Sequence, residues 1–300
     1  MPRDGLLVID KPAGPTSHDV VQRVRKALAT RRAGHGGTLD PDATGVLLVA
    51  VGRATRFFPF LAGDARSYDG RIRLGLATDT YDASGRPLGE ECRDWPGRDR
   101  LAEAMRAFEG PLLQTPPRFS AKKVGGRPGH ERARAGEDFT FGPAPVTVAR
   151  FALRAYEPPI VEFELDCSAG TYARSLAHDL GRRLGCGAHI ETLRRTAAGP
   201  YGLADAVPLA VLEADAARGR AEGRILPVEA LLADAPAAVV LPAAEGKVGH
   251  GAVLGPDDLA GPVAPADAPL VRLFSSSGRL LALARPAAGR PGLHPFLVLA

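Results

Sequence analysis

Residues 34–45, Gly-His-Gly-Gly-Thr-Leu-Asp-Pro-Asp-Ala-Thr-Gly, combine two carboxylates with four glycines and are named the aspartate loop. Asp40 precedes a proline, which steers its backbone away from the helical region. The glycines allow a substrate to approach the chain closely, and a carboxylate fixed in such a loop can act as nucleophile or general base. Asp40 and Asp42 could equally bond the local backbone, as aspartate does in many turns. The residues alone leave both interpretations open.

Signatures of nucleotide- or metal-dependent chemistry are absent from the sequence. There is no GxxxxGK[ST] phosphate loop, no HExxH pair, no GxSxG elbow and no complete GxGxxG. Cys186 and His189 have a metal-like spacing, but two such residues without a second pair more often pack in a core. We therefore expect no metal and no cofactor.

Arginine dominates the basic residues, with 33 arginines and five lysines in a chain of net charge +4. Residues 231–300 hold equal numbers of basic and acidic groups, so the surplus lies wholly in residues 1–230. The planar arginine fork pairs well with phosphate, which favours a polyanionic partner for this part. Codon usage in a GC-rich genome is the alternative explanation.

Length and composition limit the class of protein. Three hundred residues, 45% of them hydrophobic, suffice for a core in one large domain or two smaller ones. Cys92, Cys167 and Cys186 form no CxxC pair, which favours a reducing compartment over a disulfide framework. With no signal-peptide core and no run of 18 apolar residues, we expect a cytoplasmic protein that does not enter a membrane.

The elements on either side of the aspartate loop are a helix and two strands. Leu6–Ile9 is an apolar strand followed by a proline-rich turn. Thr16 or Ser17 then caps a helix with apolar residues at helical spacing. Residues 31–45 are expected to have no regular structure, and Val46–Val51 is typical of a strand buried on both faces.

Further along the chain, strands and helices alternate irregularly. Arg71–Leu76 and Val161–Cys167 alternate as half-buried strands do, while Leu101–Phe108 and Tyr172–Leu184 have the pattern of amphipathic helices. This irregular order favours an α+β fold over a repeated βαβ array. After a break near residues 233–238, short alternating runs separated by turns indicate a small β-barrel.

Apolar periodicity disappears between Thr115 and Gly142, where prolines, glycines and basic residues gather. Loops of this length in compact domains are usually functional or disordered. We expect a long, basic, partly mobile insertion. Its candidate RNA contacts are Arg118, Lys122, Lys123, Arg127, Arg132 and Arg134.

Several segments occur in the same order and spacing as in the TruB family, bacterial tRNA pseudouridine synthases that act on uridine 55 of the T loop. The resemblance covers Gly5 to about Tyr201 and, more loosely, the remainder. The matching segments are Lys11-Pro-Ala-Gly-Pro-Thr-Ser17, the aspartate loop, Tyr68 to Gly85 with Thr78-Asp-Thr80, Pro117 to Gly126 with Phe119-Ser-Ala121, Cys167 to Arg174, and Leu193-Arg-Arg195.

The resemblance implies a fold, a domain organisation and a reaction. The fold is α+β, a pseudouridine-synthase-like mixed or antiparallel sheet with flanking helices. Residues 1–237 would form the catalytic domain, with residues 115–142 as its basic thumb, and residues 238–300 a small PUA-like RNA-binding β-barrel. The reaction detaches uracil from C1′ and rejoins it through C5, without a cofactor.

The resemblance also implies roles for individual residues. Asp40 corresponds to the catalytic aspartate, Arg174 to the arginine that pairs with it, and Tyr68 to the tyrosine that stacks on the flipped base. Without the resemblance, Tyr68 would be a core aromatic at the start of a strand and Arg174 an exposed helix residue. Tyr172 and Leu193 correspond to further positions of the uridine pocket.

His35 corresponds to the histidine that helps displace the target base, a step that costs a few kcal/mol of unstacking. Two departures from the family pattern accompany it. Gly36 stands where threonine is usual, which predicts a looser backbone beside His35. In the thumb, His130 replaces a tyrosine and Pro128-Gly129 interrupts a basic helical stretch, which puts the docking geometry in doubt.

The implied partner is the T arm of tRNA, bound by a monomer without an obligatory protein partner. One alternative is a protein that binds and refolds the tRNA elbow, with catalysis secondary or lost. Another is a guide-RNA-dependent synthase, which the basic thumb and short tail disfavour.

Overall fold

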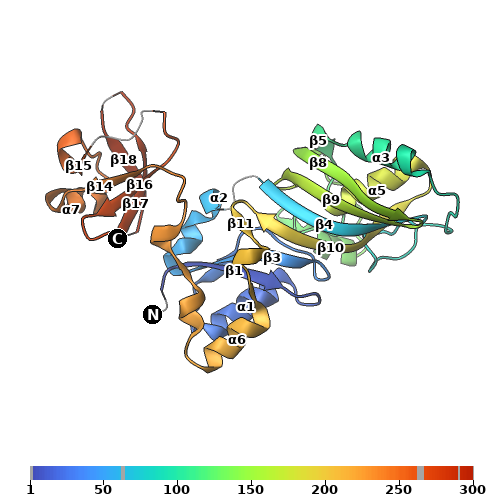
Figure 1. The fold of residues 1–300 in the computed structure, drawn as a ribbon, viewed down its shortest axis with the longest axis horizontal. Coiled ribbons are helices and arrows are strands. Elements are labelled where there is room, and N and C mark those ends of the chain that lie inside the picture. Colours follow the sequence, from blue (N-terminus) through green and yellow to red (C-terminus); the bar gives the residue numbers. More distant parts are fainter. Residues whose placement is uncertain (1–2, 62–64, 262–266, 290, 300) are drawn as a thin grey trace.

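The structure is a computed structural model that describes residues 3–61, 65–261, 267–289 and 291–299. A large mixed sheet with helices lies beside a smaller C-terminal sheet (Figure 1). In the large sheet the strand order is β12-β1-β3-β10-β4-β9-β8-β5, and β2, β11 and β13 pair with strands of this path. The bounds are β1 Gly5–Lys11, β2 Ala33–His35, β3 Thr44–Val51, β4 Ala65–Leu74, β5 Gly110–Gln114, β8 Ala144–Glu157, β9 Ile160–Ser168, β10 Ala188–Ala198, β11 Tyr201–Gly202, β12 Val207–Pro208 and β13 Leu226–Pro227.

Four helices cover the large sheet and share one apolar core with it. They are α1 Ser17–Ala27, α3 Arg98–Arg106, α5 Ala173–Leu184 and α6 Leu209–Ala217. The predicted cap of α1 is confirmed, because the Thr16 hydroxyl accepts from the Asp19 amide in a capping box. The sequence patterns that predicted helices at α3 and α5 are also confirmed, with boundaries shifted by a few residues.

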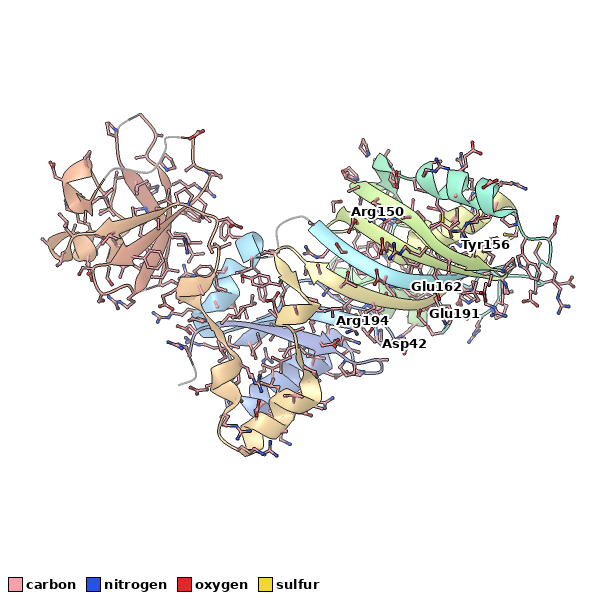
Figure 2. The ribbon with its side chains drawn as sticks, viewed as in Figure 1. Asp42, Arg150, Tyr156, Glu162, Glu191 and Arg194 are labelled. Atoms are coloured by element: carbon pink, nitrogen blue, oxygen red, sulfur yellow. The ribbon has the colours of Figure 1, made fainter. Side chains whose placement is uncertain are left out.

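Strand β9 shows why alternation predicted some strands well. Val161, Phe163, Leu165 and Cys167 are buried against the core, while the intervening residues face outward. On that outer side Glu162 pairs with Arg71, and Arg150 of β8 pairs with Glu164. Figure 2 labels Glu162 and Arg150 on these neighbouring strands.

Several strands escaped the sequence patterns, among them β2, β8 and β10. The expectation of no regular structure in residues 31–45 is wrong for β2, which pairs antiparallel with β3 through Ala33 to His35. Strand β10 was missed because two register shifts against β4 break its alternation. Strand β8 was missed although it is 14 residues long, since it also has two register shifts against β9.

The C-terminal sheet is open in the described residues. Its order is β15-β14-β16-β17-β18, and no pairing among those residues joins β15 to β18. The expected β character is confirmed, whereas a closed barrel is not shown. The bounds are β14 Ala237–Val240, β15 Leu259–Ala260, β16 Val271–Ser275, β17 Leu280–Pro286 and β18 Leu293–Val298, with helix α7 Glu245–Gly249 beside them.

A second apolar cluster connects the two bodies. Leu6 and Leu48, on the face of β1 and β3 away from the helices, belong to the same cluster as Leu283 and Leu297 of the C-terminal sheet. Helix α2, Phe58–Leu61, lies at this junction (Figure 1). Across the described ranges, no helix is long and apolar enough to span a membrane.

Candidate active site

Two side chains that precede the aspartate loop in the chain, Lys11 and Ser17, hold its backbone in place. The Lys11 side chain is fully buried, and its Nζ donates to the carbonyls of Pro41 and Ala43, each at 2.7 Å. Ser17 accepts from the Leu39 amide at 2.8 Å and donates to its carbonyl. Lys11 and Ser17 therefore hold the backbone on both sides of Asp40.

Asp40 forms an ion pair with Arg174, 134 positions later in the chain. Arg174 Nη2 and Nε each lie 2.8 Å from one carboxylate oxygen. Helix α5 begins at Ala173, so Arg174 projects from its first turn. Its side chain is only 5% exposed, against 38% for Asp40, so the prediction from helical pattern alone that Arg174 is exposed is wrong. The carboxylate keeps an open side while its partner is enclosed.

Desolvation dominates the electrostatics of Asp40. Burial raises the pKa of the Asp40 carboxyl above its usual value, and the Arg174 charge opposes that rise. The nearby Asp82 carboxylate raises the pKa further. Arg174 thus favours the ionised form of Asp40 against the desolvation that opposes it.

Asp82 is a second carboxylate of the site that the sequence analysis did not single out. Arg174 Nη1 donates to the Thr80 carbonyl at 2.9 Å and lies 3.5 Å from Asp82 Oδ2. The other oxygen of Asp82, Oδ1, accepts from the hydroxyls of Thr80 and Ser84. A signal was present, because an aspartate flanked at two-residue distance by such hydroxyls is typical of an ordered turn.

Two cavities meet at the Asp40–Arg174 pair. A cleft of about 820 Å³ is lined by both residues together with His35 and Asp82. A cavity of about 260 Å³ is lined by the same pair together with Tyr68 and Tyr172. Leu193 lines both. All six predicted site residues, drawn from four separate segments, therefore line one or both of these cavities.

Two further acidic side chains line the cleft. They are Asp42 of the aspartate loop and Glu191 of β10. Figure 2 shows both near the point where the two halves of the large sheet meet, with Arg194 close by. Arg194 Nη2 bonds Asp10 at 2.8 Å, so this arginine is engaged with β1 rather than with Asp42.

Comparison with known proteins identifies the family. The chain is 42% identical over 306 residues to tRNA pseudouridine synthase B of Thermobifida fusca, covering 99% of both chains. It is 44% identical over 233 residues to that of Dinoroseobacter shibae, covering 77% of this chain and 76% of the relative. Residues 25–173 match the TruB family pseudouridylate synthase (N terminal domain), and residues 174–233 match the tRNA pseudouridylate synthase B C-terminal domain. The chain belongs to the TruB family.

Solved structures agree with this assignment. The "Structure of H/ACA RNP bound to a substrate RNA containing 2'-deoxyuridine" matches with a TM-score of 0.72 and 28% identity, covering 99% of this chain and 85% of that chain. The "Crystal Structure of a Cbf5-Nop10-Gar1 Complex" matches with a TM-score of 0.71 and 29% identity, covering 98% and 83%. The TruB chain therefore has the pseudouridine synthase fold, and it is an isomerase acting on tRNA.

Tyr68, to which the TruB resemblance assigns stacking on the base, lines the smaller cavity. It belongs to β4, four residues into the strand rather than at its start, and its side chain is buried. Burial raises the pKa of its hydroxyl, while the neighbouring Arg195 charge opposes the rise. Arg195 is itself buried, with Nε donating to the Val46 carbonyl at 2.6 Å. Tyr68 is thus a neutral phenol at neutral pH.

The departure of Gly36 from the TruB pattern has a packing explanation. A Cβ at Gly36 would lie 2.6 Å from Cδ1 of Phe58, so the ring occupies the space of a side chain. The Gly36 amide also donates to the Leu48 carbonyl at 3.0 Å. The expected loosening beside His35 is therefore wrong, because His35 lies in paired β2 and Phe58 covers the following residue. Burial lowers the pKa of His35, which keeps the ring neutral at neutral pH.

The thumb contains a short hairpin that its sequence did not indicate and a helix that begins at Gly129. They are the hairpin β6 Lys123–Val124 and β7 Arg127–Pro128, and helix α4 Gly129–Arg134. Pro128 precedes the helix rather than interrupting it, and Gly129 is needed because a Cβ would lie 2.5 Å from Phe141. These elements are too short for a visible periodicity.

The candidate RNA contacts of the thumb are mostly exposed, yet several have acidic partners. Arg127 and Arg132 each bond Glu137 at 2.7 Å, and Arg118 lies 3.7 Å from Asp138. Lys122 and Lys123 are exposed. Arg134, together with His130, lines the cleft. The thumb therefore offers cations to the cleft and to solvent.

Cys186 and His189, which have a metal-like spacing in the sequence, lie in the interior of the protein. Both side chains are buried, and His189 Nδ1 lies 2.7 Å from the Leu76 carbonyl. Within the described part of the chain, no group of three or more histidine, cysteine or acidic residues could hold a metal ion. These two residues serve the packing of β10 and its preceding turn.

Proposed function

We propose that this chain converts uridine 55 in the T loop of tRNA to pseudouridine, with Asp40 as the catalytic residue. The observation that supports this most is the Asp40–Arg174 ion pair on the wall shared by the two cavities. An ionised carboxylate there faces both the RNA cleft and a cavity of nucleoside size. The C1′–N1 bond breaks and a C1′–C5 bond forms. The proton lost from C5 is balanced by one gained at N1, so no co-reactant is required.

The smaller cavity would receive the flipped nucleoside. Tyr68 would stack on the base, and Tyr172 and Leu193 would enclose it. His35, on the cleft side of the pair, would occupy the position that the base leaves. Asp40 would then attack the base or promote elimination to a glycal, and one oriented carboxylate serves either route.

The cleft and thumb would hold the T arm. Arg134 and His130 line the cleft, and the exposed thumb cations suit phosphate contacts that position the RNA without reading its sequence. Residues 1–237 would form the catalytic domain, and residues 238–300 a PUA-like domain that reaches the acceptor side of the tRNA. We infer a monomer that requires no protein partner.

The test uses purified protein and unmodified tRNA transcript, without added metal or nucleotide. We expect pseudouridine at position 55 from the wild type, and none from Asp40→Asn, which still binds tRNA. Asp42→Asn removes a carboxylate from the same loop and is the matched control, expected to retain most activity. Product from Asp40→Asn would disprove the role of Asp40. Binding without product by the wild type would favour the refolding alternative.

A further inference from the structure

Helix α5 contacts the loop of residues 78–85 with two side chains, one helical turn apart. Arg174 and His178 are four residues apart, a spacing that places them on the same face of the helix. Arg174 donates to the Thr80 carbonyl at 2.9 Å. His178 stacks on the ring of the next residue, Tyr81, with ring centroids 3.8 Å apart and planes 16° apart. Consecutive residues of the loop are therefore bound to successive turns of α5.

Tyr81 has an unusual backbone conformation for a bulky residue. Its φ is +65°, in the left-handed region that favours glycine. Among the described non-glycine residues, only Ala29 and Leu232 share a positive φ. A residue with a side chain keeps such a conformation only where its surroundings impose it. The stack on His178 is a ring contact that restrains the Tyr81 side chain at this turn.

The turn at Tyr81 sets both contacts that the loop makes with Arg174. Thr80, before it, supplies the carbonyl acceptor, and Asp82, after it, supplies the carboxylate 3.5 Å from Nη1. The Tyr81 carbonyl accepts from the Ile190 amide at 3.0 Å, which attaches the turn to β10. A different φ at Tyr81 would redirect the Thr80 carbonyl and the Asp82 side chain together.

We propose that Tyr81 is a positioning residue for the isomerase reaction. Its stack on His178 maintains the left-handed turn that aims the Thr80 carbonyl and the Asp82 carboxylate at Arg174, and so holds the guanidinium on Asp40. The inference rests on the proposed role of Asp40. The His178 ring suits this task, because burial lowers its pKa and keeps it neutral, and its buried Nδ1 has no hydrogen-bond partner among the described residues.

Two substitutions of Tyr81 distinguish a positioning role of its ring from an effect of backbone strain and from a role of its hydroxyl. Tyr81→Gly adopts the positive φ without steric strain but equally adopts other conformations, so that without the stack the turn is no longer fixed, whereas Tyr81→Phe keeps the stack and loses only the hydroxyl. We expect Tyr81→Gly to retain the thermal midpoint and the tRNA dissociation constant, while its single-turnover rate constant falls about tenfold or more. Tyr81→Phe should retain most of the rate. Ala29→Gly, at another positive φ outside the site, is the matched control and should not change the rate.

His178→Ala removes the other ring and leaves the backbone of Tyr81 untouched. We expect the same loss of rate, and no further loss in the double variant with Tyr81→Gly, since both changes remove one interaction. A wild-type rate in either folded single variant, or losses that multiply in the double variant, would overturn the proposal. An active Asp40→Asn would instead overturn the proposed function, whatever the Tyr81 variants do.

Discussion

Arginine side chains are held in opposite ways in the cleft and in the thumb. Arg174 is 5% exposed, and its donors are divided among a carboxylate and two backbone carbonyls. Arg127 is 55% exposed and bonds a glutamate that it shares with Arg132. A buried guanidinium with fixed partners cannot exchange them, whereas an exposed ion pair contributes little stability and can exchange its partner for phosphate. The fold therefore holds in place the charge that, in the proposed function, would act on one nucleoside, while the thumb charges that would meet the RNA backbone can change partners.

The sharpest test of this contrast is Arg174→Lys. Lysine keeps the charge but cannot span both carboxylate oxygens and the two carbonyls, so we expect the single-turnover rate constant to fall about 100-fold or more. The pKa of Asp40 should rise further because its main opposing contact weakens. Ionised Asp40 is then lost at a higher pH, and the acid limb of the pH–rate profile moves upward. Arg183→Lys, exposed on the same helix, should change neither quantity.

The pH dependence of stability tests whether the Lys11 ammonium, which holds the aspartate loop, is as well shielded from water as Arg174. Burial lowers its pKa from 10.5 to about 8. Between those values the unfolded chain binds the extra proton, so stability should rise with pH, by about 3 kcal/mol for this group. Chemical denaturation from pH 7.5 to 10.5 should show the wild type gaining this amount relative to Lys11→Met. A difference that stays constant with pH would place the ammonium in contact with water.

Substitution of Gly36 tests how tightly the Phe58 ring packs beside His35. Gly36→Ala should lower the free energy of unfolding by about 2 kcal/mol, because the new Cβ meets the Phe58 ring. The added change Phe58→Leu should restore part of it. Gly223→Ala is the control, since nothing lies within 4 Å of a Cβ there. Equal stability of Gly36→Ala and wild type in urea denaturation would show that the ring moves aside freely.

The thumb should show the smallest and most salt-dependent effect. Replacing Arg127, Arg132 and Arg134 with glutamine should weaken tRNA binding about tenfold and reduce the slope of log K against log salt by up to about two to three, through lost counterion release. Arg150→Gln with Arg154→Gln is a matched control, because these exposed arginines also share one glutamate, Glu164. An unchanged slope in the thumb variant would mean that these side chains do not touch RNA.

Local patterns predicted those elements whose burial follows a simple period. Alternation indicated β9, and the Thr16 cap indicated the start of α1. Strand β10 carries Leu193 and lies at the centre of the large sheet, yet its register shifts concealed it. The resemblance to the TruB family assigned roles to Asp40 and Arg174, but neither resemblance nor pattern indicated Asp82 or the acidic partners of the thumb.

The sequence by itself determined the chemical groups and the local geometry around them: a carboxylate before a proline, a capped helix, and a basic insertion without a cofactor motif. Only the tertiary structure decided which groups meet. The order of β3, β10 and β4 brings segments far apart in the chain around Asp40, and α5 adds Arg174 and His178. Burial, ion pairing and the fit of Phe58 over Gly36 depend on these non-local distances, which spacing along the chain does not encode.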